Sequence, residues 1–428
     1  MTDILSELKA RDLVALSTDE EALARAFAQG PVNFYIGFDP TAPSLHMGNL
    51  VQILFARRLQ EAGNNPFMLV GGATGLIGDP RMTNERSLNS REVVSGWVDS
   101  IRGQLERFID FEGAHRATMV NNFDWTGEYN AIDFLREVGK HFSVNRMLAK
   151  EAVKARLESD AGISFTEFSY QLLQGNDYRE LYKRYGVTLQ HGGSDQWGNL
   201  TSGTDLIRRT EGEHVHAMAT PLMTKADGTK FGKTESGTVW LDPELTSPYA
   251  FSQFWLNADD RDVMRYLRVF SFRSTEELDA IEEEFTAAPF KRLAQKTLAE
   301  EVTTLVHGEQ QTAQAFAAAA ALFGGGELAG LEPATLRAAT AEVPHAEATA
   351  AEISEGLGVA EAFARAGITK SKGDARRALK DGGAYVNNVK AVGEDAVITT
   401  ADVLDAGDHG VVVLRRGKKT LGALTVLN

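Results

Sequence analysis

The chain has 428 residues, of which 43% are hydrophobic and 24% charged, and its formal net charge is −15. This length exceeds one ordinary domain, and no apolar run reaches the roughly 18–20 residues that a membrane-spanning helix needs. The lack of cysteine excludes disulfides and thiolate metal sites, and no secretory signal is visible, so we expect a cytoplasmic protein.

The first half of the chain alternates between predicted strands and predicted helices. The strands are expected at 32–38, 67–70, 117–121, 188–190 and 215–219, and the helices at 47–62, 90–109, 165–185 and 195–209. Such alternation indicates crossover connections and a largely parallel sheet. We therefore expect an α/β, Rossmann-like domain.

The other segments define the domain boundaries. Residues 1–30 read as helical, with leucines at helical spacing (Leu5, Leu8, Leu13, Leu16). The predicted domains are 1–247, with an insertion at 123–165; an all-helical domain at 248–323; a linker rich in Gly, Ala and Glu at 324–356; and a small α+β domain at 357–428.

A turn-rich loop containing Asp39 and Thr41 leads from the first strand into a helix that starts near His46. The first turn of a helix offers unpaired N–H groups and a positive dipole end, which suit a phosphate. Gly48 permits close approach of a nucleotide, and Asn49 lies on the same helix face as His46. An ordinary helix cap with a solvated histidine is the alternative.

A second basic and glycine-containing segment runs from Lys230 to Thr234. It is not a Walker loop, because Gly228 and Gly232 enclose three residues where that motif needs four. We interpret it as a mobile loop that brings the ammonium groups of Lys230 and Lys233 to a polyphosphate. The alternative is a surface loop with ordinary lysines.

Between these segments, Gly192, Gly193 and Asp195 stand where a strand meets a helix. Ligands bind at such positions in open α/β sheets. The glycines would let an adenosine lie against the chain, and Asp195 could accept hydrogen bonds from ribose. Asp195 could instead be only the N-cap of the following helix.

Tyr170, Gln174 and Asp177 have the spacing i, i+4, i+7 and share one helix face. We expect Tyr35, on a buried strand, and Asp79, after a glycine-rich strand end, to point toward the same crevice. Tyr35 and Asp177 could then hold a hydroxyl group, while Asp79, Tyr170 and Gln174 could hold an ammonium group. A solvated polar face is the alternative.

The acidic net charge argues against indiscriminate binding to polyanions but leaves local basic patches possible. One such patch is predicted near the end of the chain, where Lys372, Arg376 and Lys380 repeat every four residues beside Arg377. This cationic helix face suits an RNA backbone, although it could also be simply solvated. No protein-bound metal is expected.

Four runs together resemble the class I aminoacyl-tRNA synthetases, specifically the bacterial tyrosyl-tRNA synthetases. They are Gly-Phe-Asp-Pro-Thr-Ala-Pro-Ser-Leu-His at 37–46, Gly-Gly-Ala-Thr-Gly-Leu-Ile-Gly-Asp-Pro at 71–80, Gly-Gly-Ser-Asp-Gln-Trp-Gly-Asn at 192–199, and Lys-Phe-Gly-Lys-Thr at 230–234. The last part of the chain resembles an S4-type RNA-binding domain. The resemblance covers nearly the whole chain.

The resemblance implies a role for each matching residue. The implied tyrosine site is Tyr35, Asp79, Tyr170, Gln174, Asp177, Gln190 and Gln196. The implied catalytic residues are Thr41, His46, Asn49, Lys230, Lys233 and Thr234. The implied ATP contacts are Gly37, Asp39, Gly48, Gly193, Asp195 and Lys233. The implied RNA contacts are Lys372, Arg376, Arg377 and Lys380.

The resemblance also implies a reaction in which L-tyrosine is activated by ATP with Mg²⁺ and is then transferred to tRNA(Tyr). It further implies a homodimer whose interface is the 123–165 insertion. Asn49 departs from the family pattern, in which His is usual, and Asn is also found there in tryptophanyl enzymes. A tryptophanyl enzyme and a non-catalytic RNA-binding relative are the alternatives. Arg81, Arg86 and His191 are given no role.

Overall fold

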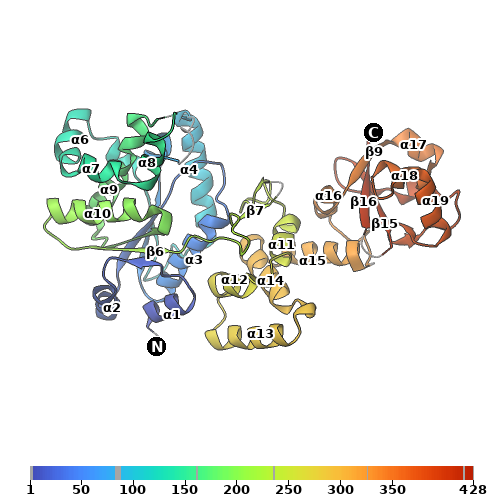
Figure 1. The fold of residues 1–428 in the computed structure, drawn as a ribbon, viewed down its shortest axis with the longest axis horizontal. Coiled ribbons are helices and arrows are strands. Elements are labelled where there is room, and N and C mark those ends of the chain that lie inside the picture. The colour runs from blue at the N-terminus through green and yellow to red at the C-terminus, as the bar shows by residue number, and fades with distance from the viewer. Residues whose placement is uncertain are drawn as a thin grey trace. The chain divides into compact units, whose positions relative to one another are not determined.

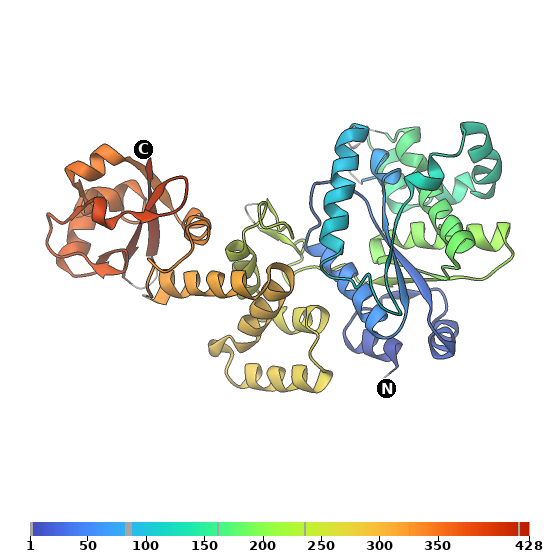
Figure 2. The ribbon, with the colours of Figure 1, turned by 180° about the vertical axis from the view of Figure 1, so that it is seen from behind.

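The computed structural model describes residues 3–81, 88–160, 162–234, 237–324, 326–417 and 420–427. The chain forms two compact units, shown from two sides in Figures 1 and 2. The first comprises Met1–Asp242 and Asp259–Thr286, and the second comprises Pro243–Ala258 and Ala287–Asn428.

The first unit is built on a six-stranded sheet. Its strands lie in the order β1 (Leu16–Ser17), β6 (His216–Thr220), β5 (Leu189–Gly193), β2 (Asn33–Phe38), β3 (Asn65–Val70) and β4 (Thr118–Asn121). Every pairing is parallel except that of the edge strand β1 with β6. The predicted Rossmann-like parallel sheet is therefore confirmed.

Helices α3 and α4 cover one face of this sheet, and α9 and α10 cover the other (Figure 1). The helices up to residue 210 are α1 (Ile4–Ala10), α2 (Glu20–Gln29), α3 (Met47–Glu61), α4 (Arg91–Leu105), α5 (Phe123–Thr126), α6 (Ala131–Glu137), α7 (Val144–Leu148), α8 (Glu151–Leu157), α9 (Phe165–Tyr185) and α10 (Trp197–Thr210). Short 3-10 turns occur at Thr74–Leu76, Gly139–His141 and Ser194–Gln196. The hairpin β7 (Lys233–Thr234) and β8 (Gly237–Thr238), α12 (Val263–Phe270) and α13 (Thr275–Ala287) follow.

Helix α9 illustrates how local sequence signals set the bounds of an element. The Ser164 side chain accepts a hydrogen bond from the backbone N–H of Glu167 and caps the first turn. Gly186 ends the helix in the left-handed conformation, with φ 64°. The helix occupies the predicted residues, 165–185.

The second unit combines helices with a mixed sheet. Its helices are α11 (Pro248–Leu256), α14 (Leu293–His307), α15 (Glu309–Gly324), α16 (Pro333–Ala341), α17 (Ala350–Glu355), α18 (Val359–Arg365) and α19 (Lys372–Lys380), with 3-10 turns at Pro289–Lys291 and Thr400–Asp402. Its strands are β9 (His345–Thr349), β10 (Leu357–Gly358), β11 (Ala384–Val386), β12 (Val389–Lys390), β13 (Val397–Ile398), β14 (Leu404–Asp405), β15 (Gly410–Arg416) and β16 (Thr420–Leu427).

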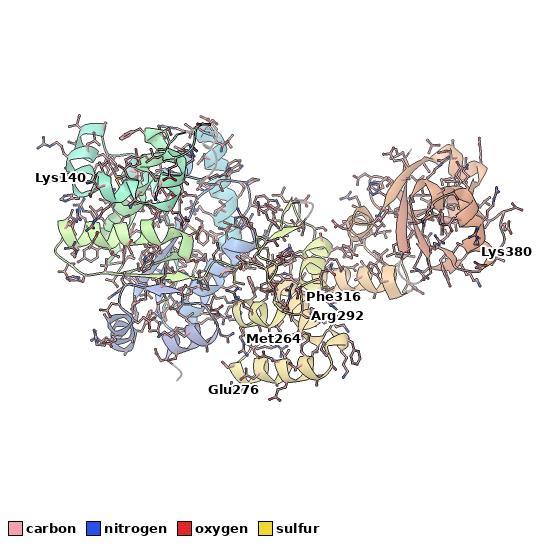
Figure 3. All side chains as sticks on the ribbon, viewed as in Figure 1. Lys140, Met264, Glu276, Arg292, Phe316 and Lys380 are labelled. Atoms are coloured by element: carbon pink, nitrogen blue, oxygen red, sulfur yellow. The ribbon has the colours of Figure 1, made fainter. Side chains whose placement is uncertain are left out.

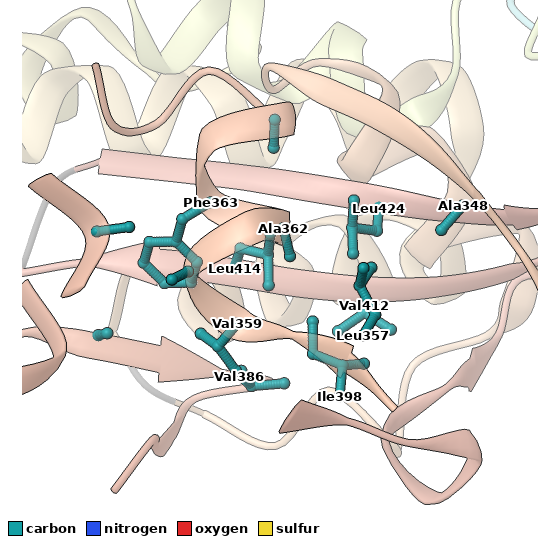
Figure 4. Close-up of a cluster of buried hydrophobic side chains, with 14 of the residues drawn as sticks. Ala348, Leu357, Val359, Ala362, Phe363, Val386, Ile398, Val412, Leu414 and Leu424 are labelled. Atoms are coloured by element: carbon teal, nitrogen blue, oxygen red, sulfur yellow. The ribbon is translucent and has the colours of Figure 1, made fainter. Parts of the chain in front are cut away.

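The main sheet of this unit has the order β12-β11-β15-β16-β9, and β9 runs parallel to β16. Because side chains alternate along a strand, β15 contributes to a core on each face. Val412 and Leu414 pack with Phe363 of α18 on one face, shown in Figure 4. Val411 and Val413 belong to a second cluster with residues of α15 and α16. This sheet is therefore covered on both sides.

Three sequence expectations differ from the structure. Leu16 lies in β1 rather than in a helix, because its backbone pairs with Ala219 of β6. The segment 324–356, expected as a linker, contains α16, β9 and α17, and β9 is hydrogen-bonded into the sheet. The predicted helical segment 248–323 is helical, but α12 belongs to the first unit while α11, α14 and α15 belong to the second.

Within the described ranges, no helix is both long and apolar enough to cross a membrane.

Candidate active site

The candidate site lies between the adjacent strands β2 and β5. The segments that follow these two strands lead to helices on opposite faces of the sheet (Figure 1). β2 has β3 on one side and β5 on the other. In open parallel sheets, a ligand crevice forms at the carboxyl ends of such a pair. Asp39 directly follows β2, and the turn Ser194–Gln196 directly follows β5.

The register of these strands brings two predicted residues together. Tyr35 of β2 is paired with Gln190 of β5, so both side chains lie on the same face. Both are buried, with 2% and 1% of their surface exposed. The rings of Tyr35 and Tyr178 of α9 are 5.3 Å apart between centroids, which identifies this face as the one under α9.

The carboxyl group of Asp177 is held from two sides at the inner end of the crevice. Its Oδ1 accepts a 2.8 Å hydrogen bond from Trp125 Nε1, and its Oδ2 accepts a 3.0 Å bond from Asn122 Nδ2. Burial raises the pKa of Asp177 to about 7, while the two donors favour the charged form and oppose that shift. The pKa of Tyr35 is raised mainly by burial and also by the negative charge of Asp177, so the two groups lie near each other.

A second group of carboxylates surrounds the hydroxyl of Tyr170. That hydroxyl donates to Asp39 Oδ2 at 2.7 Å, and Thr74 Oγ1 donates to Asp39 Oδ1 at 2.6 Å. Burial is the main cause that raises the pKa of Tyr170, followed by the charges of Asp39, Asp79 and Asp177. The crevice is therefore strongly negative along one wall, which suits a cationic ligand group.

Asp79 is held by two side-chain amides that follow β5. Gln196 Nε2 donates to Asp79 Oδ2 at 3.0 Å, and Asn199 Nδ2 donates to Asp79 Oδ1 at 3.3 Å. Sequence spacing grouped Asp79 with Tyr170 and Gln174. The structure does bring Asp79 near Tyr170, but the hydroxyl of Tyr170 bonds to Asp39.

Three predicted residues carry buried polar atoms that have no hydrogen-bond partner among the described residues. They are the hydroxyl of Tyr35, Oε1 of Gln174 and Oε1 of Gln190. Buried polar atoms are nearly always paired. Their occurrence on facing elements of one crevice is expected if a bound ligand supplies the missing partners.

The N-terminus of α3 is capped by the side chains of His46 and Asn49. His46 Nδ1 accepts a 3.1 Å hydrogen bond from Gly48 N–H, and Asn49 Oδ1 accepts a 3.0 Å bond from His46 N–H. This reciprocal capping is the helix-cap alternative considered from the sequence, and it leaves His46 Nε2 and Asn49 Nδ2 as outward donors. Thr41 is exposed in the loop that precedes them.

The loop of Lys230–Thr234 lies against this helix start. Gly232 has φ 74°, and a Cβ on it would be 2.9 Å from Met47 Cβ, so only glycine permits this approach. Phe231 packs on Tyr266, with ring centroids 5.0 Å apart. Lys230 and Lys233 are exposed. Burial lowers the pKa of His46, and the charge of Lys233 lowers it further, which places that lysine near the capped turn.

The remaining predicted nucleotide contacts line the same edge of the sheet. Gly37 is the one exposed residue of β2. A Cβ on Gly193 would be 2.5 Å from Asp195 Oδ1. Asp195 does not cap α10, because that helix starts at Trp197 with Gln196 at the N-cap and no side-chain capping bond. The capping alternative for Asp195 is therefore wrong.

The predicted RNA-contact residues lie on α19, in the second unit. All four are exposed, and Lys380 stands at the outer surface (Figure 3). Lys372 Nζ is 3.2 Å from Glu361 Oε2. The helix is fixed to its sheet by the buried side chains of Ala375 and Leu379.

Of the residues without a predicted role, Arg86 lies outside the described residues, and the backbone oxygen of Arg81 accepts a 3.3 Å bond from Arg156. His191 is buried against Phe55 of α3, with ring centroids 3.4 Å apart.

Sequence reasoning missed five side chains that build the crevice: Thr74, Asn122, Trp125, Lys150 and Asn199. Asn122 and Trp125 follow β4 at the carboxyl edge of the sheet, which is a positional signal that could have found them. Asn199 lies one helical turn after Gln196. Lys150 gave no signal, because it lies in the insertion, far from the strand ends in sequence.

Comparison with protein-family models gives two matches that together span most of the chain. Residues 28–324 match the model "tRNA synthetases class I (W and Y)". Residues 335–422 match the model "Tyrosine--tRNA ligase SYY-like C-terminal domain". The description of the first model covers the W and Y enzymes, whereas that of the second names tyrosine–tRNA ligase.

Individual relatives agree with the second match. The chain is 64% identical over 428 residues to the tyrosine–tRNA ligase of Streptomyces avermitilis, covering 100% of this chain and 99% of the relative. It is 61% identical to that of Streptomyces coelicolor, with the same coverage. A C-terminally truncated mitochondrial tyrosyl-tRNA synthetase of Coccidioides posadasii superposes with a TM-score of 0.65 at 31% identity, covering 74% of this chain and 91% of that one.

Proposed function

This chain belongs to the tyrosine–tRNA ligases, which are class I aminoacyl-tRNA synthetases, and we propose that the crevice between β2 and β5 is where it selects tyrosine. The enzyme activates L-tyrosine with ATP to give tyrosyl-adenylate and pyrophosphate. It then transfers the tyrosyl group to the 3′-terminal ribose of tRNA(Tyr).

In this proposal, the phenol of tyrosine reaches the inner end of the crevice between Tyr35 and Asp177. The unpaired hydroxyl of Tyr35 and the carboxylate of Asp177 bond to the substrate hydroxyl, and Trp125 and Asn122 keep that carboxylate in place. A substrate without the hydroxyl leaves these buried groups unpaired, which costs about 1–3 kcal/mol for each group. The crevice thus favours tyrosine over phenylalanine.

The α-ammonium group binds the negative wall of the crevice. Asp79, Tyr170 and Gln174 contact it, and Asp39 adds charge from behind Tyr170. Gln190 and Gln196 lie beside the ammonium and carboxylate groups. This polarity fixes the direction of the amino acid, with its carboxylate toward the nucleotide-binding edge of the sheet.

The carboxylate of tyrosine attacks the α-phosphorus of ATP in line, and pyrophosphate leaves. No side chain forms a covalent bond, so the enzyme acts by positioning and charge stabilisation. Because its pKa is lowered, His46 is neutral at pH 7, and because Nδ1 accepts from Gly48, the ring proton is on Nε2. His46 is therefore a hydrogen-bond donor to the phosphates.

The other predicted groups divide between the two ends of ATP. Thr41, Asn49, Lys230, Lys233 and Thr234 bind the triphosphate and the departing pyrophosphate, whereas Gly37, Asp39, Gly48, Gly193 and Asp195 adjoin adenosine. Mg²⁺ enters with the triphosphate as part of the substrate. Among the described residues, no group of three His, Asp or Glu side chains is arranged to hold a resident ion.

For tRNA, we propose that the S4-like domain predicted at 357–428 contributes the cationic face of α19, with Lys372, Arg376, Arg377 and Lys380 binding phosphates. We also propose a cytoplasmic location, where ATP and tRNA are available.

We propose a homodimer formed through the 123–165 insertion. Support comes from the large apolar side chains that this region exposes: Ile132 (65%), Leu135 (51%), Val144 (57%), Leu148 (38%) and Leu157 (51%), followed by Phe165 (75%). Exposed apolar groups concentrated in one region are typical of an interface. Light scattering should give twice the chain mass for the wild type and the single mass for Ile132→Glu/Val144→Glu.

The observation that carries the amino-acid assignment is the buried hydroxyl of Tyr35 beside the restrained carboxyl of Asp177. Amino-acid-dependent exchange of pyrophosphate into ATP tests it, with tyrosine, phenylalanine and tryptophan compared. We expect exchange with tyrosine and at least about 100-fold weaker use of the others. Exchange driven by tryptophan, or by no amino acid, would overturn the assignment.

A further inference from the structure

Lys150 lies at the N-cap of α8. Its Nζ donates to Asn199 Oδ1. Asn199 in turn donates to Asp79 Oδ1 and, at 2.8 Å, to Gln196 Oε1. Gln196 completes the ring by donating to Asp79 Oδ2. The insertion is thereby connected to the carboxylate proposed to bind the ammonium of tyrosine.

The direction of every bond in this network follows from its two ends. A lysine ammonium can only donate, and an ionised carboxylate can only accept. Asn199 must therefore turn its oxygen toward Lys150 and its nitrogen toward Asp79. Gln196 must accept from that nitrogen and direct its own nitrogen to Asp79. Without the ammonium group, Asn199 Oδ1 loses its donor, and only the acceptors Asp79 and Gln196 hold the amide in this orientation.

Two further contacts hold Lys150 in place. A Cβ on Gly198 would be 2.9 Å from Lys150 Cε, so the aliphatic stem of the lysine lies directly on this glycine. Helix α8 is anchored to α9 by a buried ion pair, in which Arg156 Nη2 is 2.9 Å from Glu167 Oε2. A lysine with a restrained stem and an anchored backbone is a rigid support rather than a mobile surface charge.

We propose that Lys150 is a positioning residue for tyrosine activation: through Asn199, it fixes Asp79 in the orientation that receives the α-ammonium group of the amino acid. The proposal rests on the tyrosine site described above. It assigns Lys150 no contact with the reacting atoms. Its effect should therefore appear in the binding of the ammonium group and not in the chemical step.

Three variants test the proposal in pyrophosphate exchange. Lys150→Met removes the donor and keeps the stem, Lys150→Arg keeps a donor-only cation, and Lys154→Met on the exposed side of α8 is the matched control. We expect Lys150→Met to raise KM for tyrosine about tenfold or more, as for loss of one hydrogen bond to a charged group. We expect kcat and KM for ATP to change little, Lys150→Arg to recover most of the loss, and Lys154→Met to behave as the wild type.

Ligand analogues identify the group through which Lys150 acts. Binding of tyramine, which keeps the ammonium, should weaken in Lys150→Met. Binding of 3-(4-hydroxyphenyl)propanoate, which lacks it, should stay unchanged. Equal weakening of both ligands, unchanged binding of tyramine, or tighter binding of tyramine would overturn the proposal.

Gly198→Ala provides a second route that leaves the charge of Lys150 intact. The added methyl group displaces the stem of the lysine, while alanine is favourable in a helix, so the variant should fold. We expect a similar rise in KM for tyrosine and no further rise in the Gly198→Ala/Lys150→Met double variant, because both changes break one network. Fully additive effects would contradict the network. Wild-type protein that does not exchange pyrophosphate with tyrosine would instead overturn the proposed function.

Discussion

Asp177 is the carboxyl group that we propose selects the hydroxyl of the substrate. It is buried, yet two donors support its charge, and a third partner is expected from the ligand. We predict that Asp177→Ala raises KM for tyrosine, and that this rise corresponds to a loss of about 2–3 kcal/mol in binding free energy. KM for ATP should change much less, because no proposed ATP contact depends on this carboxyl group.

Pyrophosphate exchange at varied tyrosine and varied ATP measures both values. Asp124→Ala, an exposed carboxylate on α5, is the control. A loss of the same size for both substrates would show that Asp177 supports the fold rather than the selection of tyrosine.

His191 gives a prediction for stability rather than activity. Burial lowers its pKa to about 3, against an opposing contribution from the backbone of Met218. In the unfolded chain the pKa is near 6.5, so between these values the unfolded state binds the extra proton. The free energy of unfolding should therefore fall as the pH falls, by about 1.4 kcal/mol per unit.

The replacement His191→Leu removes this loss. Urea unfolding at pH 7 and pH 5 measures the free energy of unfolding of both proteins. Between pH 7 and pH 5, the wild type should lose about 2 kcal/mol more of this free energy than the variant. Parallel pH dependence of the two proteins would mean that His191 is protonated in the folded state.

At the scale of elements, the sequence predicted well those segments whose own pattern decides their structure. Helix α9 has a serine cap and a terminating glycine, and β2 is a continuous apolar run. β1 and β9 were not predicted, because β1 has only two residues and the alternation in β9 is built from alanines, which are depleted in strands. β9 reads His-Ala-Glu-Ala-Thr and is a strand only because β16 pairs with it. Such tertiary pairing leaves no local signal.

The same division holds for the candidate site. Tyr35, Gln174 and Asp177 could be placed in one crevice, because helical spacing and strand register fix where their side chains lie. Of the partners that hold the carboxylates, Asn122 had its position after β4 as a signal, whereas Lys150 and Asn199 come from separate segments and could not be placed. Only the packed structure shows that Tyr170 bonds to Asp39.

The loop that carries Lys230 and Lys233 should act mainly after ATP is bound. We predict that Lys233→Ala lowers kcat for tyrosyl-adenylate formation, which corresponds to a rise of about 3–4 kcal/mol in activation free energy. KM for ATP should change less, because the negative charge develops on the pyrophosphate only as it leaves. Single-turnover kinetics measure the step, and Lys183→Ala, on the exposed part of α9, is the control. A change confined to KM would indicate ground-state binding only.

At the scale of the whole molecule, the two proposed binding sites lie in different units. The crevice belongs entirely to the first unit, whereas the basic face of α19 belongs to the second. We predict that Arg376→Glu/Lys380→Glu leaves tyrosine-dependent pyrophosphate exchange unchanged and raises KM for tRNA(Tyr).

Salt dependence provides the quantitative check. If both side chains neutralise phosphates, the slope of log affinity against log salt should fall by about 0.7–0.9 for each cation removed. The replacement Glu309→Gln, which removes one charge at the start of α15, away from α19 in sequence, is the control. An unchanged slope would remove α19 from the RNA-binding surface.

The hydrogen bond from Tyr170 to Asp39 spans 131 positions of the chain, and the insertion α5–α8 lies between them. In the proposed site, a bound amino acid contacts β2, which precedes the insertion in the chain, and α9 and β5, which follow it. The ligand should therefore stabilise the packing of these two parts of the first unit against each other. At 100 times its Kd it should add about 2.7 kcal/mol to the stability of the first unit. In calorimetry, tyrosine should raise the melting temperature of the first unit and leave that of the second unit unchanged.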